Sequence, residues 1–194
     1  MTKVLRMFGM LSLALMLSGC INYEVLETRI EVGGQDRAST IVLEYQNLSS
    51  DGKNPAEVDN DFKELINAWK GEKVLVNMAK GGIYAKSREV LIQDGKIVAR
   101  VTGLTEPGTY EDLADVNGNW DCWLGKDAVV LETNGTAYQE KEGDRQGWHI
   151  SWPKTSTGLY WRYGSSVKSE ANQKVFLEKL QNYLKETSQE TKRP

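Results

Sequence analysis

Alternating apolar and polar positions predict strands soon after residue 20. The alternation runs through residues 23–32 and returns in residues 41–45, with a Gly-Gly-Gln-Asp turn between them. A period of two is typical of strands with one buried face. The two segments are therefore predicted to form an antiparallel hairpin.

A helix is predicted next. Asn54 is suited to cap its start and Pro55 to occupy its first turn. An apolar stripe follows at spacings i, i+3, i+4 and i+7, which predicts one inward face; it consists of Phe62, Leu65, Ile66 and Trp69. The other face is interpreted as a solvated acidic surface, with Glu57, Asp59, Asp61 and Glu64. Gly71 ends this helix, and residues 74–78 could form one further helical face.

Three more strand pairs are predicted in the second half of the chain. Asp94-Gly95 lies between two alternating segments and is a strong hairpin signal, because both turn residues take positive φ. Asn134-Gly135 gives the same signal inside "DAVVLETNGTAYQE". The segments "GWHISW" and "LYWRY" are interpreted as a third pair, and "TYEDLADV" as a helical turn.

The chain is predicted to end on an amphipathic helix over residues 170–185, followed by a disordered tail over residues 188–194. The apolar stripe of this helix contains Phe176, Leu177, Leu180, Tyr183 and Leu184. Strand pairs dominate the pattern, and no βαβ alternation with glycine-rich phosphate loops is visible. The predicted fold class is therefore α+β: a mainly antiparallel sheet of hairpins packed by a central helix and a C-terminal helix, in one domain over residues 20–187.

Residues 1–20 have the pattern of an export signal. Lys3 and Arg6 precede eleven uncharged residues, 7–17, which are too few to cross a bilayer as a helix. The ending Leu17-Ser18-Gly19-Cys20 resembles the lipobox of bacterial lipoproteins. That resemblance implies removal of residues 1–19 and acylation of Cys20 by diacylglycerol and fatty acid such as palmitate. The alternative is an ordinary signal peptide in which Cys20 is incidental.

The resemblance also implies a location. Acyl chains on Cys20 would anchor the protein stably in a bacterial membrane. Ile21 follows where many inner-membrane lipoproteins carry aspartate, which favours the outer membrane in a cell with two membranes. The 175 residues from Cys20 onward hold 22 basic and 27 acidic residues, a net charge of −5. This balance argues against nucleic acid as a partner.

An aromatic region offers the most suggestive binding surface. The candidate ligand platform consists of Trp148, Trp152, Trp161 and Tyr163. If exposed, these rings could stack on glycan or peptidoglycan, while Tyr160, Arg162 and His149 face the other side. The alternative is a core beneath the C-terminal helix, because apolar alternation is usually buried.

Catalytic and metal chemistry have little support. Asp115, Asn117 and Asn119 match the first ligands of a calcium loop, but Trp120 and Lys126 stand where its glycine and bidentate carboxylate belong.

A Cys122 and His149 dyad is conceivable, but the local sequence lacks a cysteine-hydrolase signature. Once Cys20 is acylated, Cys122 has no disulfide partner, which predicts that it is buried.

Three functions follow from the sequence. The first is a non-enzymatic, membrane-anchored envelope lipoprotein that binds an envelope protein or supports an assembly, with no cofactor. The second is a glycan- or peptidoglycan-binding lipoprotein that uses residues 148–163. The third is a small hydrolase that uses Cys122 and His149.

Overall fold

The protein has an α+β fold with mainly antiparallel sheets. The computed structural model describes residues 21–33, 36–80, 82–107, 119–142, 145–165 and 172–190. The helices are α2 (Pro55–Lys70), α3 (Glu72–Lys80) and α4 (Gln173–Glu190). The strands are β1 (Ile21–Asn22), β2 (Val25–Glu31), β3 (Thr40–Gln46), β4 (Ser49–Ser50), β5 (Ile83–Gln93), β6 (Lys96–Thr105), β7 (Asn119–Gly125), β8 (Ala128–Thr133), β9 (Thr136–Glu142), β10 (Arg145–Pro153) and β11 (Gly158–Ser165).

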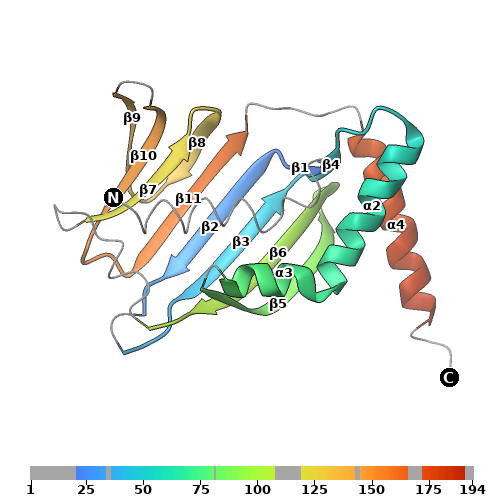
Figure 1. Ribbon diagram of the computed structural model, residues 1–194, viewed down its shortest axis with the longest axis horizontal. Helices are drawn as coiled ribbons and strands as arrows, with labels where there is room; N and C mark the ends of the chain where they lie inside the picture. The colour runs from blue at the N-terminus through green and yellow to red at the C-terminus, as the bar shows by residue number, and fades with distance from the viewer. Residues whose placement is uncertain are drawn as a thin grey trace.

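A six-stranded sheet with the order β5-β6-β3-β2-β11-β8 forms the centre of the molecule (Figure 1). Its inner face is apolar, because alternate residues of each strand share a face. Ile30 pairs with Ile41, and Leu26 lies between Tyr45 and Tyr163. Its outer face carries arginine and glutamate side chains. The sheet therefore buries one face and presents a charged one.

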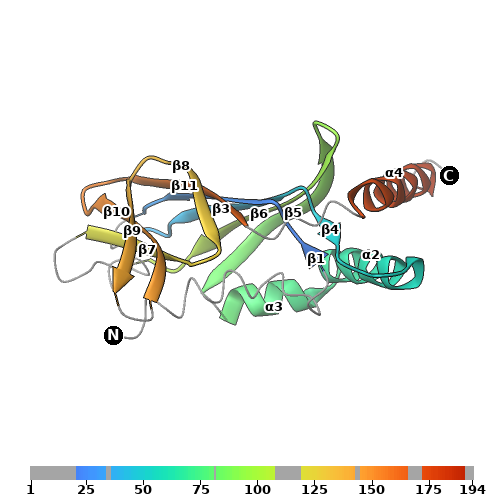
Figure 2. The same cartoon turned by 90° about the horizontal axis from the view of Figure 1, so that it is seen from above.

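A three-stranded sheet, β7-β10-β9, covers one end of the inner face. Figure 2 shows it on the same side of the large sheet as α3. The rings of Trp152 on β10 and Trp161 on β11 lie 5.4 Å apart in the common core. The predicted pairing of "GWHISW" with "LYWRY" is therefore wrong: β10 pairs with β7 and β9, and β11 with β2 and β8.

The predicted hairpin at Asn134-Gly135 is also wrong, because β8 and β9 belong to different sheets. The Asn134 side chain is used for tertiary contacts instead of a tight turn. Its Oδ1 accepts hydrogen bonds from Trp152 Nε1 at 2.7 Å and from the backbone N–H of Tyr160 at 2.9 Å. The turn thereby fastens the two sheets to each other.

The other two predicted hairpins are confirmed. β2 pairs with β3, and β5 pairs with β6 in antiparallel register. Asp94 and Gly95 have φ values of 50° and 72°, as this type of two-residue turn requires.

The helices lie mainly at the other end of the large sheet (Figure 1). Asn54 caps α2 by accepting from the backbone N–H of Glu57, with Pro55 in the first turn, as predicted. Leu65 and Trp69 are buried as predicted. Asp61 corrects the prediction of a fully solvated acidic face: it is 3% exposed and accepts a hydrogen bond from Ser50.

The C-terminal helix is confirmed and runs further than predicted. α4 reaches Glu190, so the expected disorder from Ser188 is wrong up to that residue, and residues 191–194 lie outside the described chain. Phe176 and Leu180 are fully buried. Within the described ranges, none of the helices combines the length and the apolar character needed to span a membrane.

Candidate functional site

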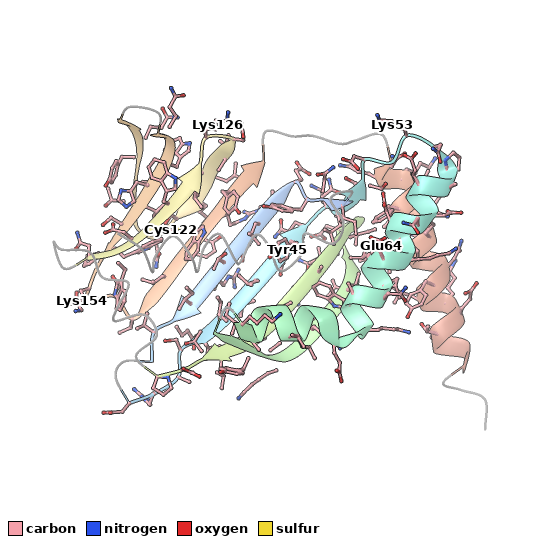
Figure 3. The ribbon with its side chains drawn as sticks, viewed as in Figure 1. Tyr45, Lys53, Glu64, Cys122, Lys126 and Lys154 are labelled. Carbon is pink, nitrogen blue, oxygen red and sulfur yellow. The ribbon has the colours of Figure 1, made fainter. Side chains whose placement is uncertain are left out.

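The Cys122 thiol lies in the core between the two sheets (Figure 3). It is 0% exposed, and burial, followed by the nearby Asp121 carboxylate, raises its pKa far above the ordinary value. The prediction that Cys122 is buried is confirmed. A thiol held in its neutral form inside the core is a poor nucleophile.

The Cys122 and His149 dyad is excluded by the alternation of strand residues. Cys122 pairs with Ile150, whereas His149 pairs with Trp123, so the two side chains leave opposite faces of the small sheet. On the outer face, His149 Nε2 lies 3.3 Å from Asp121 Oδ1, and its Nδ1 bonds to the Tyr138 hydroxyl.

The predicted exposed aromatic platform is wrong, because its members are buried or partly buried. Trp152 and Trp161 are 2% and 1% exposed, and Trp148 and Tyr163 pack partly buried against the same core. The rings lie between the two sheets, not beneath the C-terminal helix, because β10 and β11 face each other in two layers. They therefore cannot offer an exposed stacking surface.

The other candidates fall largely outside the described residues. Cys20 does, as do Asp115 and Asn117 of the calcium motif. Asn119 is the first residue of β7 and pairs with Pro153. In the described ranges, no cluster of three or more histidine, cysteine or carboxylate side chains could hold a metal ion.

Two buried carboxylates on the outer face of the large sheet are explained by ion pairs across strands. Glu44 Oε2 lies 2.8 Å from Arg100 Nη2, and the hydrogen bond from Arg100 to Glu44 raises the pKa of the guanidinium. Glu27 Oε2 lies 3.3 Å from Arg162 Nε. Each arginine also reaches a second glutamate, Glu89 or Glu132. Such ladders hold neighbouring strands together and do not by themselves indicate a ligand.

A groove of about 390 Å³ between α2, β5 and α4 is a candidate site formed entirely by described residues. We call it the helical groove. Its walls are mostly apolar and are formed by Ile66 and Trp69 from α2, Val90 from β5, and Leu180, Tyr183 and Leu184 from α4. Its polar residues are Lys70, Arg88 and Glu89. Ligand sites commonly combine a mostly apolar wall with a few placed polar groups.

Two polar atoms in the groove walls are buried without hydrogen-bond partners. They are Nε1 of Trp69 and the hydroxyl of Tyr183. Trp69 as a whole is 6% exposed. A buried polar group left unpaired costs about 1–3 kcal/mol, so it calls for an explanation. Neither atom is accessible to water, so an acceptor in the groove could reach it only if the surrounding side chains moved.

Two cations lie at the end of the groove where α2 stops. The guanidinium of Arg88 donates to the carbonyl oxygens of Lys70, at 2.8 Å, and Gly71. Lys70 Nζ lies 4.9 Å from the centre of the Tyr183 ring. Glu89 pairs with Arg100 at 3.2 Å. Neither Lys70 nor Arg88 pairs with a carboxylate in the part of the chain that the structure describes.

Sequence patterns do not reveal this site, because its parts come from three distant segments. The stripes of α2 and α4 predicted only that the helices pack inward. Whether a groove remains between two packed helices depends on the distance between them. No local sequence pattern determines that distance. The one available signal was Tyr183, a polar tip within the stripe of α4.

Comparison of the chain with protein-family models, with curated proteins and with solved structures gives no match.

Proposed function

We propose that this protein is a lipid-anchored protein of a bacterial cell envelope whose domain binds an apolar ligand in the helical groove without catalysis. The observation that carries the proposal is a mostly apolar groove between α2, β5 and α4 with two cations, Lys70 and Arg88, at one end. Small-molecule sites are typically concave and mostly apolar, with a few polar groups that orient the ligand.

The anchor rests on the lipobox resemblance of residues 17–20 and Cys20, and its outer-membrane location on Ile21. β1 begins at Ile21, one residue after the proposed lipidation position. A residue of extended chain spans only about 3.3–3.6 Å. The domain would therefore be held close to the bilayer, where apolar ligands are concentrated.

Catalysis is left out of the proposal for a geometric reason. Cys122 and His149, the pair that the sequence offered, lie on opposite faces of the small sheet. A glycan platform over residues 148–163 is likewise not proposed, since Trp152 and Trp161 are buried. An envelope protein as partner remains a prediction from the sequence.

The anchor is tested with Cys20→Ala. The unchanged protein should incorporate radiolabelled palmitate and sediment with membranes, whereas the variant should do neither. Membrane association and labelling of Cys20→Ala equal to those of the unchanged protein would contradict the anchor.

The groove is tested with the neutral apolar dye N-phenyl-1-naphthylamine, which fluoresces when it leaves water. Leu184 and Val175 are both exposed apolar residues of α4, at 36% and 43%, but only Leu184 lines the groove. Leu184→Asp should abolish the fluorescence increase, and Val175→Asp should leave it unchanged. Equal fluorescence in both variants would contradict the groove as the binding site.

A further inference from the structure

We propose that the occupant of the helical groove is a single-chain anionic amphiphile of the fatty-acid type. Its carboxylate lies at the end formed by Lys70 and Arg88, and its hydrocarbon chain lies against the apolar walls. This inference rests on the proposed function of the groove and specifies the chemical class of its ligand.

The polar groups of the groove favour a ligand with a negatively charged polar group. The ammonium of Lys70 and the guanidinium of Arg88 line the groove and have no acceptor atoms. The single carboxylate on the rim, Glu89, already pairs with Arg100. The groove thus offers donors that a ligand can use, which favours a group rich in acceptor oxygens.

The charge at this end has a specific origin. The last carbonyls of α2 carry the negative end of the helix dipole, and Arg88 binds the carbonyl of Lys70, its last residue, and that of the following Gly71. The positive charge of Arg88 therefore compensates the partial negative charge of the helix end. The charge of Lys70 is left unneutralised. The Lys70 ammonium lies over the Tyr183 ring, within the groove lining. An anionic head there would make a charge-assisted contact that a neutral or cationic head could not.

The size of the groove limits the apolar part. About 390 Å³ is near the lower end of the roughly 300–1,000 Å³ typical of small-molecule sites. This suits one hydrocarbon chain better than the two chains of a diacyl phospholipid. Fatty acids partition into the bilayer near which the proposed anchor would hold the domain, so ligand and site would meet at the membrane surface.

The test uses competition between the dye and three chains of equal length that differ only in head group. These are dodecanoate, dodecanol and dodecylamine, the two ions below their micelle-forming concentrations and the alcohol below its solubility limit. Dodecanoate should displace the dye at the lowest concentration and dodecylamine at the highest.

Lys70→Met keeps an apolar stem but removes the charge. It should raise the concentration of dodecanoate needed to displace the dye by roughly tenfold, the size of one charge-assisted contact. The concentration of dodecanol needed should not change. Lys174→Met, on the exposed part of α4, is the matched charge control and should change neither.

The outcomes separate the two proposals. If all three chains displace the dye equally, or Lys70→Met has no effect, the anionic ligand is wrong and the apolar groove stands. If a hydrophobic peptide with a free carboxyl end binds far better than dodecanoate, the groove stands and the ligand class is a peptide. If the dye itself does not bind, both proposals fail.

Discussion

The two ends of the large sheet both contain large aromatic side chains, but only one end is closed. At the end covered by β7, β9 and β10, Trp152 and Trp161 fill the space between two sheets. At the other end, Trp69 and Tyr183 line a groove that α2 and α4 leave between them and β5. The segment richest in tryptophan is core, and the segment that looked like ordinary helix packing holds the candidate site.

The polar atoms of the aromatic rings show the same difference. Trp152 Nε1 donates to Asn134, and Trp120 Nε1 donates to the backbone carbonyl of Lys154 at 3.2 Å. Trp69 Nε1 and the Tyr183 hydroxyl are buried without a partner. Two indoles of the closed end are thus hydrogen-bonded, as is usual for buried indoles, whereas the indole of Trp69 is not.

The closed end should protect the Cys122 thiol most strongly of all. Because Cys122 is 0% exposed, a thiol reagent can reach it only after the sheets separate. Labelling of the native protein should therefore be slower than that of the urea-unfolded protein by roughly a thousandfold or more. Labelling is followed by mass spectrometry, on protein that starts at residue 21. Rapid labelling of the native state would show that the two sheets do not form a closed core.

Truncating a ring at the closed end should strongly destabilise the fold. Trp161→Ala should lower the free energy of unfolding by about 3–5 kcal/mol, because it opens a cavity between the sheets. Leu184→Ala, in the wall of the open groove, should lower it by about 1 kcal/mol or less. Urea unfolding followed by circular dichroism measures both. Losses of equal size would remove the distinction between the two ends.

The Asn134 side chain should contribute less to the free energy of unfolding than the buried ring of Trp161. Asn134→Ala leaves Trp152 Nε1 and the backbone N–H of Tyr160 without this acceptor, at an expected cost of about 1–3 kcal/mol. Asn182→Ala, on the exposed surface of α4, is the control and should be neutral or slightly stabilising. If the two variants unfold at the same urea concentration, the turn does not fasten the sheets.

The smallest expected effect is a pH dependence at the open end, where Lys179 of α4 contacts Asp59 of α2. The hydrogen bond from Lys179 lowers the pKa of Asp59 below its ordinary value. The stabilisation is therefore present above the unfolded pKa and is lost as pH falls through the folded one. Asp59→Asn should unfold at slightly lower urea than the unchanged protein at about pH 6, and the difference should disappear near pH 2. A difference that persists in acid would contradict this contact.

Local signals predicted the elements whose partners are close in sequence. Asp94-Gly95 forms the predicted turn, and Asn54-Pro55 starts the predicted helix, because a few neighbouring residues determine both structures. The resulting α+β class follows from the number of strand pairs and the two amphipathic helices.

Local signals failed where tertiary contacts override them. Asn134-Gly135 has the residues of a hairpin turn, but the Asn134 side chain bonds to β10 and β11 instead. The alternation in "GWHISW" and "LYWRY" predicted two strands and an apolar face, but not that the strands belong to two layers. The helical groove depends on the distance between helices separated by a hundred residues of chain, which no short pattern encodes.

The most direct test of the contrast between the ends uses the six indole N–H resonances in a nitrogen–proton NMR spectrum, assigned by single Trp→Phe variants. N-phenyl-1-naphthylamine is added to the native protein until the fluorescence signal saturates. We expect the Trp69 resonance to move the furthest, because Trp69 lines the groove and a bound aromatic dye would lie beside it. The resonances of Trp120, Trp152 and Trp161 should stay in place, since those rings lie in the closed core. Movement of Trp152 and Trp161 with Trp69 unchanged would contradict the account.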